Sequence, residues 1–292
     1  MLKYDSISEL VAEAGKGRQR ISDIVLEDQA LACEMSKENM YKRMYKAFRI
    51  MQTSIDDGLM EDTRSVSGLT GGSAIKMKRQ VDAGKNICGH LFGEAMTMAL
   101  AVSETNACMG KIVAAPTAGS CGILPAAIIS VMNDRKIPTK DAVMGLFTAS
   151  AVGLVIANKA SIAGAEGGCQ AECGSASAMA AAALVEMCGG TPAMVADGCA
   201  IALKNILGLV CDPVAGLVEI PCIKRNAMGT ANAFTAAELA LAGITSAIPA
   251  DEVIWAMKKI GDSMVPALKE TGEGGLAATP TGKKLKRMVF GD

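Results

Sequence analysis

Residues 142–157, AVMGLFTASAVGLVIA, form the longest apolar run in this chain of 292 residues. The run is bounded by Lys140–Asp141 and by Asn158–Lys159. It is shorter than the ~20 apolar residues that a helix needs to cross a lipid bilayer. Thr139, behind Pro138, is a suitable residue for the start of a helix. The run therefore predicts a helix buried in a protein core.

Four further segments carry signals for the start of a helix. A Ser, Thr or Asp side chain can accept a hydrogen bond from a backbone N–H of the first helical turn. The expected N-caps, each followed by apolar residues at helical spacing, are Ser6, Ser36, Thr191 and Asp251. The helix after Thr191 is expected to run to about residue 207, and the helix after Asp251 to end near residue 261.

Composition favours one helical domain. Hydrophobic residues make up 50% of the chain and aromatic residues 3%, so most apolar side chains are aliphatic. Strand-like alternation of apolar and polar residues is scarce. We predict a mainly α fold: residues 1–292 form a single compact domain, with a more charged N-terminal helical layer at 1–62 and a core at 63–292 that is rich in Gly and Ala.

Charge excludes a generic nucleic-acid-binding surface. Lys and Arg number 29 and Asp and Glu number 30, so the excess basic charge that phosphates attract is absent. The N-terminal residues are polar and lack the apolar stretch of a secretory signal. We therefore expect a cytoplasmic protein that binds neither nucleic acid nor a membrane. Its cysteines are then thiols or metal ligands rather than a disulfide framework.

The ten cysteines include three at junctions between loops and expected helices. These are Cys169, Cys211 and Cys222, placed where a thiolate can point into a cavity. Three such thiolates would suit a [4Fe–4S] cluster with one iron free to act as a Lewis acid. Position alone does not select these three from ten, and the chain has no CxxC pair. The others are expected to be small buried hydrophobic residues: Cys33, Cys88, Cys108, Cys121, Cys173, Cys188 and Cys199.

Three long segments resemble one protein family. They are GGCQAECGSASAMAAAALVEMCGGTP (167–192), LKNILGLVCDPVAGLVEIPCIKRNAMG (203–229) and APTAGSCGILPA (115–126). They are similar to the iron–sulfur L-serine dehydratases, and specifically to the α subunit, which is the catalytic chain. Further similar segments are SVSGLTGG (65–72), ALAVSETNACMGKI (99–112) and LKETGEGGLAATPTG (268–282).

The resemblance implies conversion of L-serine to pyruvate and ammonia without pyridoxal phosphate. In the family, three cysteines hold a [4Fe–4S] cluster, and they match Cys169, Cys211 and Cys222. The expected fold is thus a helical domain with Gly-rich loops around a metal-cluster cavity. The chain lacks the Ser-Ser-His-Thr motif of the regulatory domain in single-chain relatives and ends without a cysteine. It resembles the two-subunit form, so a separate β subunit and a hetero-oligomer are expected.

Gly-rich segments are candidates for binding the carboxylate of serine. Glycines beside hydroxyl groups expose backbone N–H donors that can bind anions. The alternative is that these segments are ordinary turns between helices. The candidate carboxylate donors are Thr70, Gly71, Gly72, Thr117, Gly119 and Ser120. Gln170 and Glu172 flank Cys169 and are expected to tune the cluster.

The base that removes the Cα proton is open at this stage. Lys76 is a candidate, since a lysine desolvated near a cationic cluster can act as a base; the alternative is a solvated surface lysine. Asn158 and Ser161 are candidates for lining the catalytic pocket, or for capping the loop that follows them. His90, the one histidine, lies outside the similar segments, so we expect it to be incidental. The β chain could also supply the base.

Three other functions compete with serine dehydration. A cysteine desulfidase would keep the three cysteines and differ in substrate. A redox sensor would hold the cluster without turnover, but it would not need the Gly- and Thr-rich loops. A structural zinc protein would bind zinc without sulfide.

Overall fold

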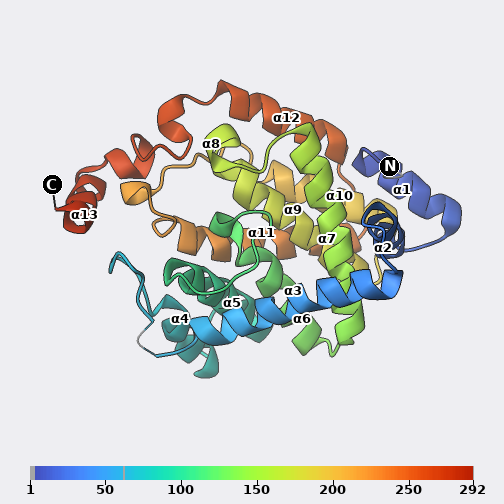
Figure 1. Ribbon diagram of the computed structural model, residues 1–292, viewed down its shortest axis with the longest axis horizontal. Helices are drawn as coiled ribbons and strands as arrows, with labels where there is room; N and C mark the ends of the chain where they lie inside the picture. Colours follow the sequence, from blue (N-terminus) through green and yellow to red (C-terminus); the bar gives the residue numbers. More distant parts are fainter. Residues whose placement is uncertain (1–3, 62, 292) are drawn as a thin grey trace.

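The computed structural model describes residues 4–61 and 63–291, and in these residues the fold is built from helices (Figure 1). The prediction of a mainly α protein is confirmed. The only β pairing among the described residues is an isolated bridge between Cys211 and Lys269. The α-helices are α1 (Ile7–Gly17), α2 (Ile21–Ala32), α3 (Lys37–Gly58), α4 (Ser73–Asp82), α5 (Gly89–Ala107), α6 (Ile123–Asp134), α7 (Thr139–Lys159), α8 (Gly164–Gly167), α9 (Ser175–Met187), α10 (Pro192–Lys204), α11 (Cys222–Leu241), α12 (Ala250–Ser263) and α13 (Pro280–Phe290). Short 3-10 or π-helical segments are η1 (Ala118–Ser120), η2 (Gln170–Gly174), η3 (Val214–Gly216), η4 (Pro266–Leu268) and η5 (Gly275–Ala278).

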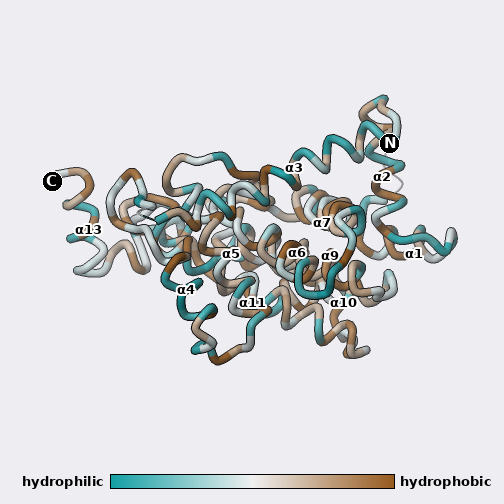
Figure 2. The backbone as a smooth tube through the Cα atoms, turned by 90° about the horizontal axis from the view of Figure 1, so that it is seen from below, coloured by the Kyte–Doolittle hydropathy of each residue, from teal (hydrophilic) through white to brown (hydrophobic). Residues whose placement is uncertain are grey.

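Helix α9 lies at the centre of the core. Its residues from Ser175 to Val185 are buried, and helices α6, α7, α10 and α11 pack around it. Most of these buried residues are Ala or Ser, so neighbouring backbones can approach α9 closely. Hydrophobic residues gather around α6 and α7, whereas α3 and α4 carry hydrophilic stretches (Figure 2).

Helix α7 contains the apolar run at 142–157, and it is the helix expected from that run. It is long and apolar enough to span a membrane, but 72% of its most apolar window is buried inside the protein. It packs against α9 and α2. Gly145 and Gly153 of α7 leave room for the side chains of Met187 and Met179 on α9. The prediction of a buried core helix is confirmed.

Three of the expected N-caps are confirmed. The hydroxyl groups of Ser6, Ser36 and Thr191 each accept a hydrogen bond from a backbone N–H in the first turn of α1, α3 and α10. The expected cap at Asp251 is wrong, because α12 already begins at Ala250. The Asp251 carboxylate instead accepts hydrogen bonds from the N–H groups of Ile7 and Ser8, and so stabilises the start of α1.

Two predicted helix ends are shifted, and several helices begin without a capping side chain, α2, α5 and α6 among them. Helix α10 ends at Lys204 rather than near 207, because the chain turns there and the N–H of Gly208 donates to the Gln170 side chain. Helix α12 continues to Ser263. Helix α2 follows Arg20, whose side chain makes no capping bond. The boundary between a layer at 1–62 and a core at 63–292 stays a prediction.

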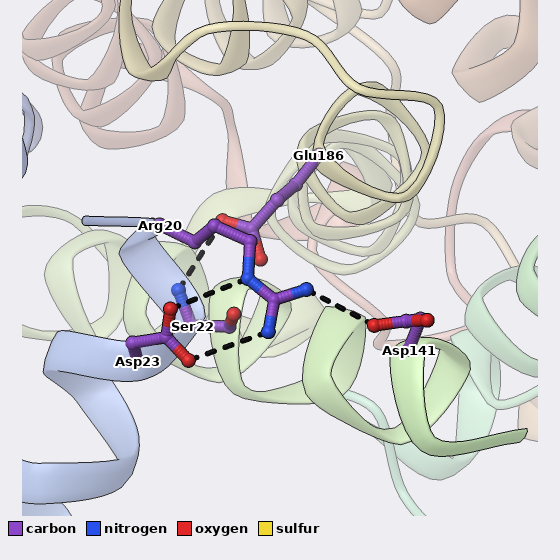
Figure 3. A network of polar contacts seen from close by, with 5 residues as sticks. All are labelled: Arg20, Ser22, Asp23, Asp141 and Glu186. Atoms are coloured by element: carbon purple, nitrogen blue, oxygen red, sulfur yellow. Dashed lines mark hydrogen bonds and ion pairs between the residues drawn. The ribbon is translucent and has the colours of Figure 1, made fainter. Parts of the chain in front are cut away.

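A polar network joins α2 to the core (Figure 3). The guanidinium of Arg20 binds the carboxylates of Asp23 and Asp141, the second of which belongs to α7. Beside it, the N–H of Ser22 donates to Glu186 on α9 at 3.2 Å. Burial raises the pKa of Glu186 above its ordinary value of 4.5, although hydrogen bonds from Ser22 oppose this shift.

The raised pKa of Glu186 predicts a pH-dependent effect of Glu186→Gln. The folded protein binds this proton more tightly than the unfolded chain, so the carboxyl group adds stability below pH 4.5 and loses that contribution as pH rises through the raised pKa. The variant Glu186→Gln cannot lose this stability contribution with pH, because an amide does not titrate. Chemical unfolding from pH 4.5 to 8 should show wild type losing stability relative to Glu186→Gln as pH rises. The exposed substitution Glu252→Gln is the control, and parallel curves for Glu186→Gln and wild type would contradict the prediction.

Close packing of α3 on α5 predicts that Gly58→Ala is strongly destabilising. A Cβ atom at Gly58 would overlap the backbone carbonyl of Ala101, which cannot move like a side chain. We expect a loss of about 1–3 kcal/mol or more in the free energy of unfolding. The matched control is Gly15→Ala in α1, where nothing lies within 4 Å of the new Cβ. That substitution should be neutral or stabilise by about 0.5–1 kcal/mol; equal effects in urea titrations would refute the packing argument.

Candidate functional site

The three predicted ligand cysteines lie in one buried region between α8, α11 and η2. Cys169 directly precedes the π-helical segment η2, Cys222 is the first residue of α11, and Cys211 lies in the extended segment between α10 and η3. Their exposed fractions are 3%, 8% and 3%. A negative charge on Cys169 raises the pKa of both Cys211 and Cys222, and a charge on Cys222 raises the pKa of Cys211, so the thiols share a local environment.

Arg225 holds the segment around Cys211 in place. Its guanidinium donates to the carbonyl oxygen of Val210 at 2.8 Å and to the carboxylate of Asp212 at 2.9 Å. It therefore binds the residues on both sides of Cys211. The ion pair with Asp212 is largely buried, with exposed side-chain fractions of 14% and 5%. Cys211 is fixed from the other side by backbone hydrogen bonds to Leu268 and Glu270.

The thiols differ in their electrostatic surroundings. A hydrogen bond with Cys173 lowers the pKa of Cys169, and the positive charge of Arg225 acts in the same direction against the effect of burial. Burial raises the pKa of Cys222 to about 12, and it also raises the pKa of Cys211, where the charge of Glu172 adds to the effect. Negatively charged thiolates at Cys211 and Cys222 thus need a nearby cation to offset their charge.

Two carboxylates accompany the cysteines. One oxygen each of Glu172 and Glu270 and the sulfur of Cys211 lie within 4.8 Å of one another, close enough to hold a metal. The Thr117 hydroxyl donates to Glu172 Oε1 at 2.8 Å, and Cys211 Sγ lies 3.9 Å from Glu172 Oε2. Burial raises the pKa of Glu172, and the hydrogen bond from Thr117 lowers it.

Glycines let the backbone approach these donors closely. A Cβ atom at Gly164 would lie 2.9 Å from Glu172 Oε2 and 3.0 Å from both Cys211 Sγ and Glu270 Oε2, too close for a side chain to fit. At Gly119 it would lie 3.2 Å from Glu172. Soft thiolate donors fit a metal or cluster that prefers sulfur ligands. Cys169, Cys211 and Cys222 are not among the groups of described residues whose ligand atoms all lie within 4.8 Å of one another, the arrangement that a single zinc ion would require.

The segment around Thr117, Gly119 and Ser120 borders the cysteine region. The hydroxyl groups of Thr117 and Ser120 are 3.2 Å apart, and the carbonyl of Gly119 accepts a hydrogen bond from Asn226 on α11. Their role in binding a substrate carboxylate stays a prediction. The structure shows that this segment, η1, touches η2, which directly follows Cys169, and α11, which begins with Cys222.

The segment Thr70–Gly72 lies at the start of α4. The Thr70 hydroxyl donates to Glu219 at 2.6 Å, three residues before Cys222. The N–H groups of Ser73 and Ala74 donate to the buried carboxylate of Glu104 at 2.7 and 3.1 Å. The first amides of α4 therefore already bind an anion from this chain, which leaves the Thr70 hydroxyl and the Gly71–Gly72 backbone as the predicted donors.

The remaining predicted residues lie nearer the surface. Lys76 on α4 and Asn158 on α7 are exposed, and no hydrogen bond in the described residues joins either to the cysteines. Ser161 donates to Glu166 Oε2 at 2.7 Å and accepts from the N–H of Ala163, as a loop cap does. His90 is exposed at the start of α5. It lines a surface pocket together with Phe92 of α5 and Phe234 of α11.

Sequence reasoning missed several residues of the site. Arg225 follows Cys222 by three residues on one helix face, a spacing that could have indicated it. Glu270 lies in one of the similar segments and Gly164 lies outside all of them, and only the tertiary structure brings the two together.

The expectation that the other seven cysteines are buried is confirmed for Cys121, Cys173 and Cys199. It is wrong for Cys33 and Cys88, which are exposed, and the other two are half-buried: Cys108 and Cys188.

Comparison with known proteins places the chain in a family. The family model "Serine dehydratase alpha chain" matches residues 16–277. A probable L-serine dehydratase alpha chain of Bacillus subtilis is 51% identical over 99% of this chain and 96% of its own length. The L-serine dehydratase alpha chain of Peptoniphilus asaccharolyticus is 47% identical over 92% of each chain. A probable alpha chain of Latilactobacillus sakei is 59% identical over 68% of this chain and 95% of its own. The chain therefore belongs to the serine dehydratase alpha chain family.

Proposed function

We propose that this chain is the catalytic α chain of a cytoplasmic L-serine dehydratase, which converts L-serine to pyruvate and ammonia with a [4Fe–4S] cluster and without pyridoxal phosphate. The observation that carries the proposal is the convergence of three buried thiols, Cys169, Cys211 and Cys222, on one region that also holds Glu172 and Arg225. The names of the relatives supply the substrate and the subunit type.

The three cysteines would hold the cluster as thiolates. When bound, the cluster would supply an iron without a protein ligand, which acts as a Lewis acid toward the hydroxyl group of serine. The chain supports this chemistry with its own charges. Arg225 offsets the negative charge of the thiolates, and its hydrogen bonds to Val210 and Asp212 fix the position of Cys211.

Around the cysteines, polar side chains would orient the substrate. The Thr117 hydroxyl donates to one carboxylate oxygen of Glu172, and the other oxygen lies close to Gly164. The segment 117–120 is the better placed of the two carboxylate candidates, because it contacts η2 directly. Thr70, Gly71 and Gly72 act from the Glu219 side in this proposal. Ser161 and Asn158 would line the outer part of the pocket.

The reaction also needs a base for the Cα proton and a partner chain. Lys76 is the proposed base, and since it is exposed, a partner must cover it before its ammonium group is desolvated. The relatives named alpha chain belong to multi-subunit enzymes. We infer that this chain assembles with a separate β chain into a hetero-oligomer, and that the β chain closes over the site.

The proposal predicts oxygen-sensitive release of pyruvate from L-serine. The chain is reconstituted with iron and sulfide without oxygen, mixed with its β chain, and assayed before and after exposure to air. Activity should not need pyridoxal phosphate and should fall in air, because an iron that binds substrate is also open to oxygen. Faster pyruvate release from L-cysteine would indicate a desulfidase. A full complement of iron and sulfide without pyruvate from either substrate would contradict the proposal.

The ligand assignment predicts that Cys211→Ala loses the cluster. Removal of one of three thiolates should lower bound iron and sulfide to near background, together with the visible absorption of the cluster. The control is Cys33→Ala, which changes an exposed cysteine outside the site and should bind iron and sulfide like wild type. Circular dichroism checks that both variants are folded. Retention of iron and sulfide by folded Cys211→Ala would refute the assignment.

A further inference from the structure

Cys173 is a buried nucleophile that the proposed reaction does not use. It lies in η2, four residues after Cys169, with 1% of its surface exposed. Its Sγ is 3.4 Å from Sγ of Cys169, and the two thiols share a hydrogen bond. A predicted ligand of the cluster is therefore in direct contact with a second cysteine.

The backbone places these two residues side by side. Residues four apart on a helix face the same side, with Cβ atoms about 5–6 Å apart. A disulfide requires Cβ atoms about 3.5–4.5 Å apart, so the short π-helical segment must move by about 1–2 Å for the two sulfur atoms to join. The sulfur atoms are already in contact at 3.4 Å, so this local movement is the one change that the bond needs.

The pair is also the favoured pair among the thiols of the cavity. Cys211 Sγ lies against the carboxylate of Glu172 rather than against another sulfur. Among hydrogen bonds in the described residues, the one between Cys169 and Cys173 is the only one that joins two sulfur atoms. Cys199 is buried as deeply, but it lies on α10 and has no such contact.

We propose that Cys173 is a resolving cysteine for Cys169: when the cluster is absent and a peroxide reaches Cys169, the two form a disulfide that a thiol reductant can reverse. The proposal rests on the proposed function only in taking Cys169 as a cluster ligand. The disulfide keeps that ligand from reloading while the conditions are oxidising. It also keeps the sulfur from higher, irreversible oxidation.

The chemistry is balanced with hydrogen peroxide as the oxidant. The thiolate of Cys169 attacks one oxygen, the O–O bond breaks, and hydroxide leaves a sulfenic acid on Cys169. The thiolate of Cys173 then attacks that sulfur, the S–O bond breaks, and a second hydroxide leaves. The two hydroxides take the two thiol protons and become water. Two thiols lose two electrons, and one peroxide is reduced to two water molecules.

The test uses the full-length chain, freed of cluster under anaerobic conditions and then exposed to one equivalent of hydrogen peroxide. Free thiols are alkylated with one reagent, disulfides are reduced, and the released thiols are alkylated with a second reagent before mass spectrometry. We expect the second label on Cys169 and Cys173 together. After treatment with dithiothreitol, wild type should regain its capacity to bind iron and sulfide.

Cys173→Ser tests the role of the second thiol. For this comparison both proteins receive excess hydrogen peroxide, because the step from sulfenic to sulfinic acid consumes a second peroxide. Without Cys173, Cys169 should proceed to sulfinic acid, which thiols do not reduce, so iron and sulfide uptake by the variant after dithiothreitol should fall roughly fivefold or more below wild type. Cys199→Ser is the buried control and should recover like wild type.

Three results would overturn the proposal: a disulfide from Cys169 to Cys211 or Cys222, no disulfide at all, or equal sulfinic acid in wild type and Cys173→Ser. The labelling of wild type decides the matter even if Cys173→Ser does not fold. None of these measurements involves serine. A chain that forms the disulfide but yields no pyruvate would refute the proposed function alone.

Discussion

The structure depends on bringing three buried thiols from distant parts of the chain into one place. Cys169 and Cys222 are 53 positions apart, and Cys211 lies on a segment without regular structure. Thiol groups with raised pKa values do not attract one another, so the surrounding fold must hold them together. Arg225 does this most directly, because one guanidinium binds both neighbours of Cys211 and places a positive charge near Cys169.

The helical core provides the rigid frame for that arrangement. Helix α9 begins directly after η2 and carries small side chains into the centre of the molecule, where α7, α10 and α11 pack against it. Gly229 on α11 leaves room for the side chains of Ile123 and Ser177, which a Cβ atom at this position would meet at 2.4 and 3.1 Å. Because Cys222 is the first residue of α11, the close packing of α11 on α9 fixes the distance between Cys222 and Cys169.

The same geometry relates the proposed chemistry to its vulnerability. An iron that binds substrate would also be open to small oxidants. In that proposal the site needs a way to protect its ligands when the metal is lost. The contact of Cys169 with Cys173 would offer such protection by a local rearrangement, since Cys169 directly precedes the segment that carries Cys173.

The sequence by itself determined the helical class, the buried nature of α7, three helix caps and the identity of the family. Those features depend on local periodicity, on capping side chains and on long ungapped motifs, which are all visible in one dimension. It did not determine that Asp251 caps α1, that Arg225 binds around Cys211, or that Gly164 borders Glu172 and Glu270. These contacts join residues far apart in the chain, and only the packing of the helices decides which of them meet.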